Sequence, residues 1–167
     1  MLDETYLLNE IKETVSFVSP SFSADLSRAW KGGLRDRKSV DPDIAIDYVL
    51  PDYETSTHGF MRPHDPVKAK ARRLQPLQGP REDILPLGNE RFAVPELLFN
   101  PTDIGMQEAG LPECVMQSLS VLPPALQAGM LANVVVVGGN ALIPGFMERL
   151  YVLAPFSSRA LIAVAVC

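Results

Sequence analysis

The hydrophobic pattern at the start of this chain has a helical period. Within residues 3–17, apolar side chains recur three and four positions apart, as they do on one face of an amphipathic helix. This face consists of Leu7, Leu8, Ile11 and Val15. Asp3 is the expected N-cap, because its carboxylate can accept hydrogen bonds from the first turn. A second, shorter helix is predicted over residues 23–30, where Gly32-Gly33 would end it.

Three further helices are predicted in the second half of the chain. The clearest covers residues 111–122, with Pro112 at the first helical position, where a missing N–H costs nothing. Its apolar stripe consists of Val115, Met116, Leu119 and Leu122. Pro123-Pro124 ends this helix and begins the next, whose expected buried face is Leu126, Met130 and Leu131. The last helix is expected from about Gly145, with Phe146, Leu150 and Leu153 on one face.

Two strands are predicted, and the second has an unusual sequence. Residues 45–50 form the first, which Pro51-Asp52 breaks. Val134 to Val137 are four consecutive valines, and such a run is typical of a strand buried on both faces. Gly138-Gly139 follows at once, where glycine would let a ligand approach the backbone and a following helix start would present N–H groups. Taken alone, this unit is more simply a tight turn.

The composition is that of a globular protein. Apolar residues make up 47% and charged residues 21% of the chain, which excludes a disordered class. The net charge of −5 argues against general nucleic-acid binding as the main activity.

The basic residues are concentrated in one stretch, residues 62–81. It holds six of the fifteen basic residues, one acidic residue and four prolines, and it is predicted to be a long, exposed and mobile loop. Its basic side chains could contact DNA phosphates or an acidic partner. They include Lys68, Lys70, Arg72 and Arg73. A solvated loop is the preferred interpretation, because no aromatic residues are interleaved with the charges.

The cysteines and histidines suggest no metal or disulfide chemistry. The two cysteines, Cys114 and Cys167, form no CxxC motif, which favours a reducing compartment. Cys114 is predicted to be a small core residue and not a nucleophile. His58 and His64 have no further ligand at metal-binding spacing. The start of the chain resembles no signal peptide, and no apolar run reaches the length of a membrane span.

Three motifs, far apart and in the same order, resemble the actin superfamily. They are Ile11-Lys12-Glu13, the segment from Gly88 to Pro101 that begins Gly-Asn-Glu-Arg-Phe, and the segment from Asn133 to Leu150 around the valine run and Gly-Gly. The segments Ile46–Tyr53 and Pro101–Glu113 resemble a nuclear actin-related subfamily more than conventional actin. The long insertion between Pro51 and Gly88 also fits that subfamily.

The resemblance implies an α/β, actin-like (ribonuclease-H-like ATPase) fold that is incomplete. Residues 1–107 would form the insertion-bearing subdomain and residues 108–155 part of the neighbouring sheet-containing subdomain. Residues 156–167 would be an apolar tail outside the family pattern. The two phosphate loops of the family, and the groups that position magnesium and water, would precede the opening helix. A truncated or mis-spliced gene model is therefore expected.

The resemblance also implies where a nucleotide would lie. The residues that match the adenine side of the family's pocket are Lys12, Glu13, Gly138, Gly139, Asn140 and Ile143. Ile143 stands where the family usually has an aromatic residue, so it offers apolar contact without stacking. ATP is expected as a cofactor of a full-length family member and is not expected to bind this chain tightly. Neither catalytic residues nor metal ligands are expected.

Two functions are compatible with the resemblance. The preferred one is a non-catalytic scaffold subunit of a nuclear SWR-type chromatin-remodelling complex, which exchanges a histone variant in nucleosomes. Its partners would be other remodelling subunits and, indirectly, nucleosomes and histones, without a membrane or direct sequence-specific nucleic-acid binding. Its location would be the nucleus, with the cytoplasm as a second site. The alternative is an ATP-binding, actin-like cytoskeletal protein or ATPase, which the expected lack of phosphate loops disfavours.

Overall fold

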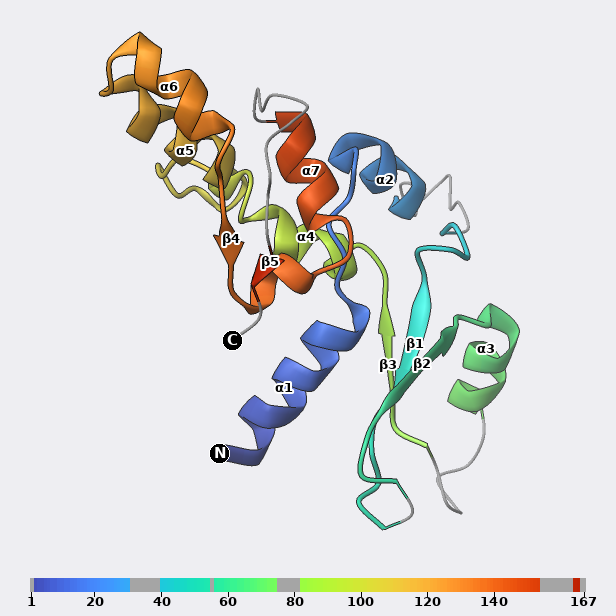
Figure 1. Ribbon diagram of the computed structural model, residues 1–167. Helices are drawn as coiled ribbons and strands as arrows, with labels where there is room; N and C mark the ends of the chain where they lie inside the picture. Colours follow the sequence, from blue (N-terminus) through green and yellow to red (C-terminus); the bar gives the residue numbers. More distant parts are fainter. Residues whose placement is uncertain (1, 31–39, 55, 75–81, 154–163, 166–167) are drawn as a thin grey trace. The chain divides into compact units, whose positions relative to one another are not determined.

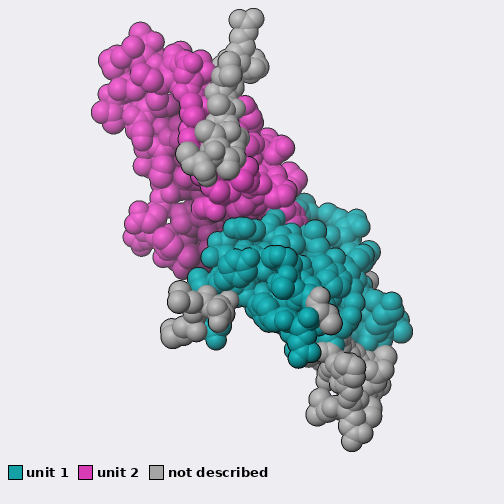
Figure 2. Space-filling model, turned by 60° about the horizontal axis from the view of Figure 1, so that its bottom comes forward, with its two compact units in different colours: residues 1–16, 23–91 teal, residues 17–22, 92–167 magenta. Residues whose placement is uncertain are grey.

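The computed structural model describes residues 2–30, 40–54, 56–74, 82–153 and 164–165. The chain divides into two compact units, each formed by two separate stretches of sequence (Figure 2). Unit 1 contains residues 1–16 and 23–91, and unit 2 contains residues 17–22 and 92–167. Their assignment to actin-like subdomains with a boundary at residue 107 stays a prediction. No helix in the described part of the chain combines the length and apolarity that a membrane crossing requires.

Unit 1 is built on a three-stranded antiparallel sheet with the order β2-β1-β3 (Figure 1). The strands are β1 (Ile46–Val49), β2 (Phe60–Pro63) and β3 (Ile84–Leu87). All four residues of β1 are buried, because this strand lies in the centre of the sheet. The strand predicted over residues 45–50 is therefore confirmed. Pro86 lies in β3 and Pro63 in β2, both at sheet edges, where a missing N–H is tolerated.

Helix α1 (Leu2–Val15) supplies the apolar cover of this sheet. Ile11 and Val15 pack with Ile46 and Tyr48, and partly buried Leu7 joins them, as the helical spacing predicted. Two details of the prediction are wrong. Leu8 is largely exposed, because it falls beside the contact face, and the helix already includes Leu2, so Asp3 is not its N-cap.

Arg91 ties the end of α1 to the chain that enters β1. Its Nε donates to the carbonyl oxygen of Val15 at 3.1 Å, and its Nη1 donates to those of Ile44 at 2.8 Å and Asp43 at 3.3 Å. Burial lowers the pKa of Arg91, and the three carbonyl oxygens compensate for the lost hydration.

Helix α2 (Phe22–Ala29) corresponds to the helix predicted over residues 23–30, whereas Gly32-Gly33 lies outside the described residues.

The prediction that residues 62–81 form one long loop is wrong for their first part. Residues 62 and 63 belong to β2, and α3 covers Pro66–Leu74. Asp65 begins this helix, because its Oδ1 accepts from the backbone N–H groups of Val67 at 3.0 Å and Lys68 at 3.2 Å. The bond from the Lys68 N–H is the main cause that lowers the pKa of Asp65. Residues 75–81 lie outside the described part of the chain.

Unit 2 is mainly helical. Its complete helices are α5 (Leu111–Ser120), α6 (Pro124–Leu131) and α7 (Phe146–Leu153), with the short 3-10 helices η1 (Pro101–Ile104) and η2 (Gly139–Leu142). The unit also takes most of α4 (Glu90–Glu96). Pro112 lies in the first turn of α5, as predicted. The expected buried face of α6 is wrong, because both Leu126 and Met130 are exposed.

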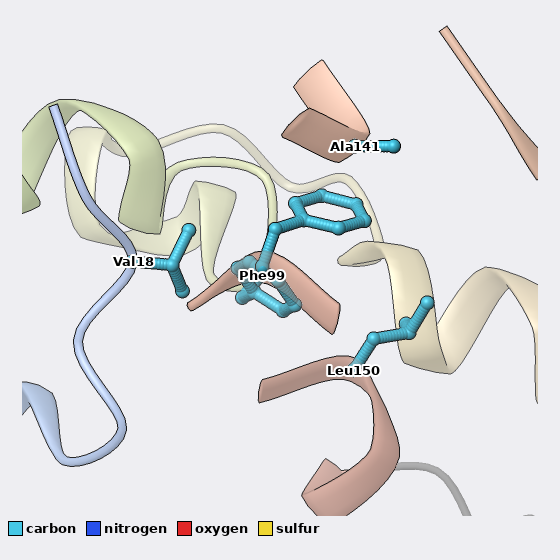
Figure 3. Close-up of a cluster of buried hydrophobic side chains, with 5 residues drawn as sticks. Val18, Phe99, Ala141 and Leu150 are labelled. Carbon is cyan, nitrogen blue, oxygen red and sulfur yellow. The ribbon is translucent and has the colours of Figure 1, made fainter. Parts of the chain in front are cut away.

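The core of unit 2 is a small cluster that draws on four parts of the sequence. Val18, Phe99, Ala141, Phe146 and Leu150 pack together in one buried cluster, whose side chains are drawn in Figure 3. The rings of Phe99 and Phe146 lie 5.5 Å apart between centroids. The predicted apolar face of α7 is therefore confirmed at Phe146 and Leu150, whereas nothing is described for the Leu153 side chain.

The valine run departs most from its prediction. Only β4 (Val136–Val137) is a strand, and it pairs in parallel with β5 (Val164–Ala165). Val135 and Val137 are each more than half exposed, so the strand is not buried on both faces. Burial of such a run depends on neighbouring strands, and one described neighbour leaves most of it uncovered.

Cys114 is also exposed, with its Sγ donating to the Ala109 carbonyl at 3.3 Å, so its expected core position is wrong.

Candidate functional site

The Gly-Gly loop follows β4 directly and has the backbone that its sequence requires. Gly138 adopts a φ of 122°, which an L-residue with a side chain rarely takes. A Cβ at Gly138 or Gly139 would meet no atom within 4 Å, so glycine is required at 138 by conformation and not by crowding. The Gly138 carbonyl accepts from the Ala141 N–H at 3.1 Å and begins η2. The loop thus presents an open backbone surface, as a ligand-binding loop must.

The two side chains predicted beside this loop behave differently. Asn140 is exposed, and its backbone carbonyl accepts from the Ile143 N–H at 3.2 Å. Ile143 is partly buried and packs against the core cluster of unit 2. A side chain held in that way has less apolar surface to offer a ligand.

The loop is fixed at its far end to the residues that precede α2. The Val18 N–H donates to the Pro144 carbonyl at 2.7 Å, and Val18 itself lies in the core cluster. A strong backbone bond and a buried anchor therefore determine where the Gly-Gly loop lies within unit 2.

Arg149 makes a second connection to the same segment, through a buried ion pair. Its Nη1 donates to the Pro20 carbonyl at 2.7 Å, and its Nη2 lies 2.9 Å from Oε1 of Glu96. Asn100 Nδ2 donates to the same Oε1 at 2.5 Å, and the Glu96 side chain is only 1% exposed. Buried charge is tolerated when it is paired and hydrogen-bonded, and here the pair joins residue 20, α4 and α7.

Sequence reasoning did not find the Glu96–Arg149 pair, although both residues lie within the quoted motifs. The available signal was a charged residue inside an apolar run: Glu96 precedes Leu97-Leu98-Phe99, and Arg149 precedes Leu150. A charge in such a setting is expected either to be exposed or to have a partner. The 53-residue separation gives no clue to which partner it is.

The other predicted contacts, Lys12 and Glu13, lie on α1 in unit 1, and both are exposed. Lys12 Nζ donates to Asn9 Oδ1 at 3.3 Å, an ordinary bond within one helix. The structure therefore brings four of the six predicted residues together in one loop of unit 2 and places the other two side by side in unit 1. Nucleotide binding by these residues stays a prediction.

The two histidines each pair with a carboxylate of unit 1. His58 Nδ1 lies 3.1 Å from Glu10 Oε1, and His64 Nδ1 lies 2.6 Å from Asp47 Oδ1. Among the residues that the structure describes, no group of three or more histidine, cysteine or acidic side chains is arranged to hold a metal ion.

Unit 2 places a strand, a Gly-Gly loop and a helix in succession, and the described residues combine helices with small sheets, so the architecture belongs to the mixed α/β class. The sequence model of the family Actin matches residues 1–153, so the chain belongs to the actin family and its fold is part of an actin-like domain. The resemblance described from the three motifs is confirmed.

Several curated proteins are similar to this chain. An actin-like protein arp6 of Emericella nidulans is 56% identical over 157 residues, which covers 90% of this chain and 33% of that protein. An actin-related protein 6 of Neurospora crassa is 46% identical, covering 99% of this chain and 38% of that protein. An actin-related protein 6 of Drosophila melanogaster is 39% identical, covering 90% and 34%. The chain thus spans about a third of the length of these relatives.

Proposed function

We propose that the chain belongs to a non-catalytic, actin-related scaffold subunit of a nuclear SWR-type chromatin-remodelling complex, which exchanges a histone variant in nucleosomes. The observation that carries this proposal is the 56% identity to an actin-like protein arp6 over 90% of the chain. The subfamily expected from segments Ile46–Tyr53 and Pro101–Glu113 is the one named in these relatives. The partners are other remodelling subunits, and nucleosomes are reached through them.

The proposed role is structural because the described residues offer surfaces for binding and little for chemistry. Unit 1 presents the helix α3 with exposed Lys68 and Lys70, and unit 2 presents exposed apolar side chains on α6 and β4. Any nucleotide would serve the structure and would use the Gly138–Asn140 loop. The protein acts in the nucleus, with the cytoplasm as a second location.

The alternative is an ATP-binding, actin-like cytoskeletal protein or ATPase. The open backbone of the Gly-Gly loop favours it, since glycines there leave room for a ligand. Charge-assisted contacts to a triphosphate would be needed for tight binding, and the described loop supplies backbone groups only.

Co-expression of the tagged chain with the other subunits of such a complex tests the proposal. We expect co-purification with remodelling subunits, a nuclear signal for the fluorescently tagged chain, and no phosphate release above background with magnesium and ATP. A matched control is the chain with Glu96→Gln, which disturbs unit 2 without changing the surface of unit 1. Sustained ATP turnover by the purified chain would favour the alternative, and failure to assemble with any subunit would contradict the scaffold role.

A further inference from the structure

Helix α3 concentrates positive charge in unit 1. It follows the edge strand β2 with only His64 and Asp65 between them (Figure 1). Its nine residues include four lysines and arginines and no acidic residue. The stretch of residues 62–81 that contains α3 carries a net charge of +5, whereas the rest of the chain carries −10. Positive charge on an otherwise acidic protein is therefore gathered in one short region, which attracts an anionic partner.

The start of α3 is attached to the central strand of the sheet. The His64 N–H donates to the Ala45 carbonyl at 3.3 Å, and His64 Nδ1 lies 2.6 Å from Oδ1 of Asp47 on β1. Asp65 Oδ1 then accepts from two backbone N–H groups of the first turn. A helix that is already ordered loses less conformational entropy when it binds a partner.

One side of α3 presents an apolar side chain between two ammonium groups. Successive helical residues are rotated by about 100°, so Val67 lies about 60° from Lys70 on one side and about 100° from Lys68 on the other. Val67 is 74% exposed, the Lys68 side chain is 87% exposed, and Lys70 is exposed as well. Ala69, about 200° from Val67, lies on the opposite side and is partly buried. We define the α3 surface as Val67, Lys68 and Lys70.

The carboxylates that contact this part of the chain already have partners. Asp47 pairs with His64, and Glu82 Oε2 lies 2.9 Å from Arg62 Nη2. Asp65 is used for the helix start, and its Oδ2 lies as far as 3.7 Å from Lys68 Nζ. Carboxylates of a partner would therefore meet little competition for the ammonium groups of the α3 surface.

The observations favour an acidic protein segment over a nucleic acid as this partner. A nucleic acid extends well beyond a helix of about 14 Å, and the charge of −10 on the rest of the chain repels it. Residues 62–81 contain no phenylalanine, tyrosine or tryptophan on which bases could stack. The exposed Val67 is of no use to a phosphate backbone, whereas a protein segment supplies apolar side chains that can cover it.

We propose that the α3 surface is a docking site for an acidic segment of a partner protein, with an apolar side chain among its carboxylates. The carboxylates contact the ammonium groups of Lys68 and Lys70, and the apolar side chain packs against Val67. The proposal rests on the scaffold role for the presence of a protein partner, and it adds the chemistry of that partner and the surface that receives it.

The test is fluorescence anisotropy with the purified 167-residue chain and the labelled peptide Glu-Glu-Leu-Glu-Glu. The main variant is Lys68→Gln with Lys70→Gln, because glutamine removes both charges and has a helix propensity similar to that of lysine. We expect its affinity to fall by roughly two-fold or more, as the loss of two exposed charge contacts implies. Added salt should weaken binding by the parent chain and affect this variant much less.

Matched controls separate the two parts of the surface from their background. Lys68→Arg with Lys70→Arg keeps both charges and should bind like the parent chain. Lys12→Gln removes a charge from an exposed position of α1 and should leave the affinity unchanged, whereas Lys70→Gln should lower it. Val67→Ala should weaken binding of the leucine peptide by roughly two- to three-fold. It should not change the affinity for Glu-Glu-Ser-Glu-Glu, which lacks the apolar side chain.

The proposal is overturned if the parent chain does not bind the leucine peptide, or if the variant without the two lysine charges binds it equally well. An unchanged affinity of Val67→Ala for this peptide would also overturn it, because the apolar contact would then be absent. So would tighter binding of a single-stranded oligonucleotide with the same charge, since the surface would then select phosphate. The assay contains no remodelling subunit, so its result is independent of co-purification. The docking site can therefore fail while the scaffold role stands, and the reverse.

Discussion

Replacing Tyr48 by phenylalanine removes one oxygen atom from the core of unit 1. The Tyr48 side chain is 0% exposed, and its hydroxyl has no hydrogen-bond partner among the residues that the structure describes. Burial of a hydroxyl without a partner costs about 1–3 kcal/mol. The void left by one oxygen, on the order of 10 Å³, costs about 0.2 kcal/mol in return. Tyr48→Phe should therefore stabilise unit 1 by about 1–3 kcal/mol.

The sign of this effect is diagnostic. Loss of a hydroxyl that is well hydrogen-bonded destabilises a protein by about 1 kcal/mol, the opposite of the expected result. Urea titration, read by hydrogen exchange of the amides of Ile46 to Val49, reports the stability of this sheet alone. The midpoint should rise with an unchanged slope. Tyr6→Phe, at an exposed position of α1, is the control and should leave the midpoint where it was.

The pH dependence supplies a second measurement. Burial, and next the charge of Glu10, raise the pKa of Tyr48 above its ordinary value. A raised pKa means that the native state favours the neutral phenol, so this contribution is complete below the unfolded pKa of about 10 and is lost as the pH rises through the folded pKa. The parent chain should lose stability in this alkaline range, and Tyr48→Phe should lose less. A destabilised variant with an unchanged alkaline profile would refute the reasoning, because it would show that the hydroxyl has a partner.

Three other predictions concern unit 2 and the ligand. Glu96→Gln should destabilise unit 2 by about 3–5 kcal/mol in a calorimetric melt, because it leaves Arg149 buried without its counter-charge. The control is Arg28, an exposed residue whose guanidinium pairs with Asp25 at 3.0 Å and Asp41 at 2.9 Å. Arg28→Ala should hardly change the melting temperature, and equal losses in the two variants would contradict the distinction between buried and exposed pairs. The isolated chain should bind the hydrophobic dye ANS through exposed side chains such as Val135 and Val137, whereas a sharp melt without dye binding would show that this surface is covered. Isothermal titration with Mg-ATP should give weak or no binding, and a micromolar affinity would contradict this expectation.

The elements that local chemistry determines were predictable from the sequence. The start of α5 follows from Pro112 in the first turn, and α1 follows from the spacing of Ile11 and Val15. Helix α3 has a comparable start signal, Asp65 before Pro66, but the prolines and charges around it suggested a loop. The side-chain oxygen of Asp65 and the helix-forming residues that follow outweigh that composition.

Features that depend on distant partners were not predictable. The apolar character of Val135 indicated burial, but burial requires neighbours on both sides of a strand, and the sequence does not say which neighbours are present. The pairing of Glu96 with Arg149 likewise joins segments with no local relation. Within the candidate site, the need for glycine at 138 was predictable from the Gly-Gly turn. The partial burial of Ile143 in the core was not, because it depends on the residues packed behind the loop.

Residues 17–22 belong to unit 2 but lie in the sequence between the two stretches of unit 1. This order affects how the protein folds during synthesis. Phe17 and Phe22 belong to unit 2, and each ring lies 5.7 Å from that of Phe92 between centroids. During synthesis, Phe92 follows Phe17 by roughly 4–15 seconds at typical elongation rates. In that interval both rings lack the Phe92 ring, although the neighbouring residues of unit 1 have already been synthesised. Truncation of the gene after the codon for Arg91 would therefore give a product in which Phe17 and Phe22 lack the Phe92 ring. Neither unit can be excised as one uninterrupted stretch of sequence.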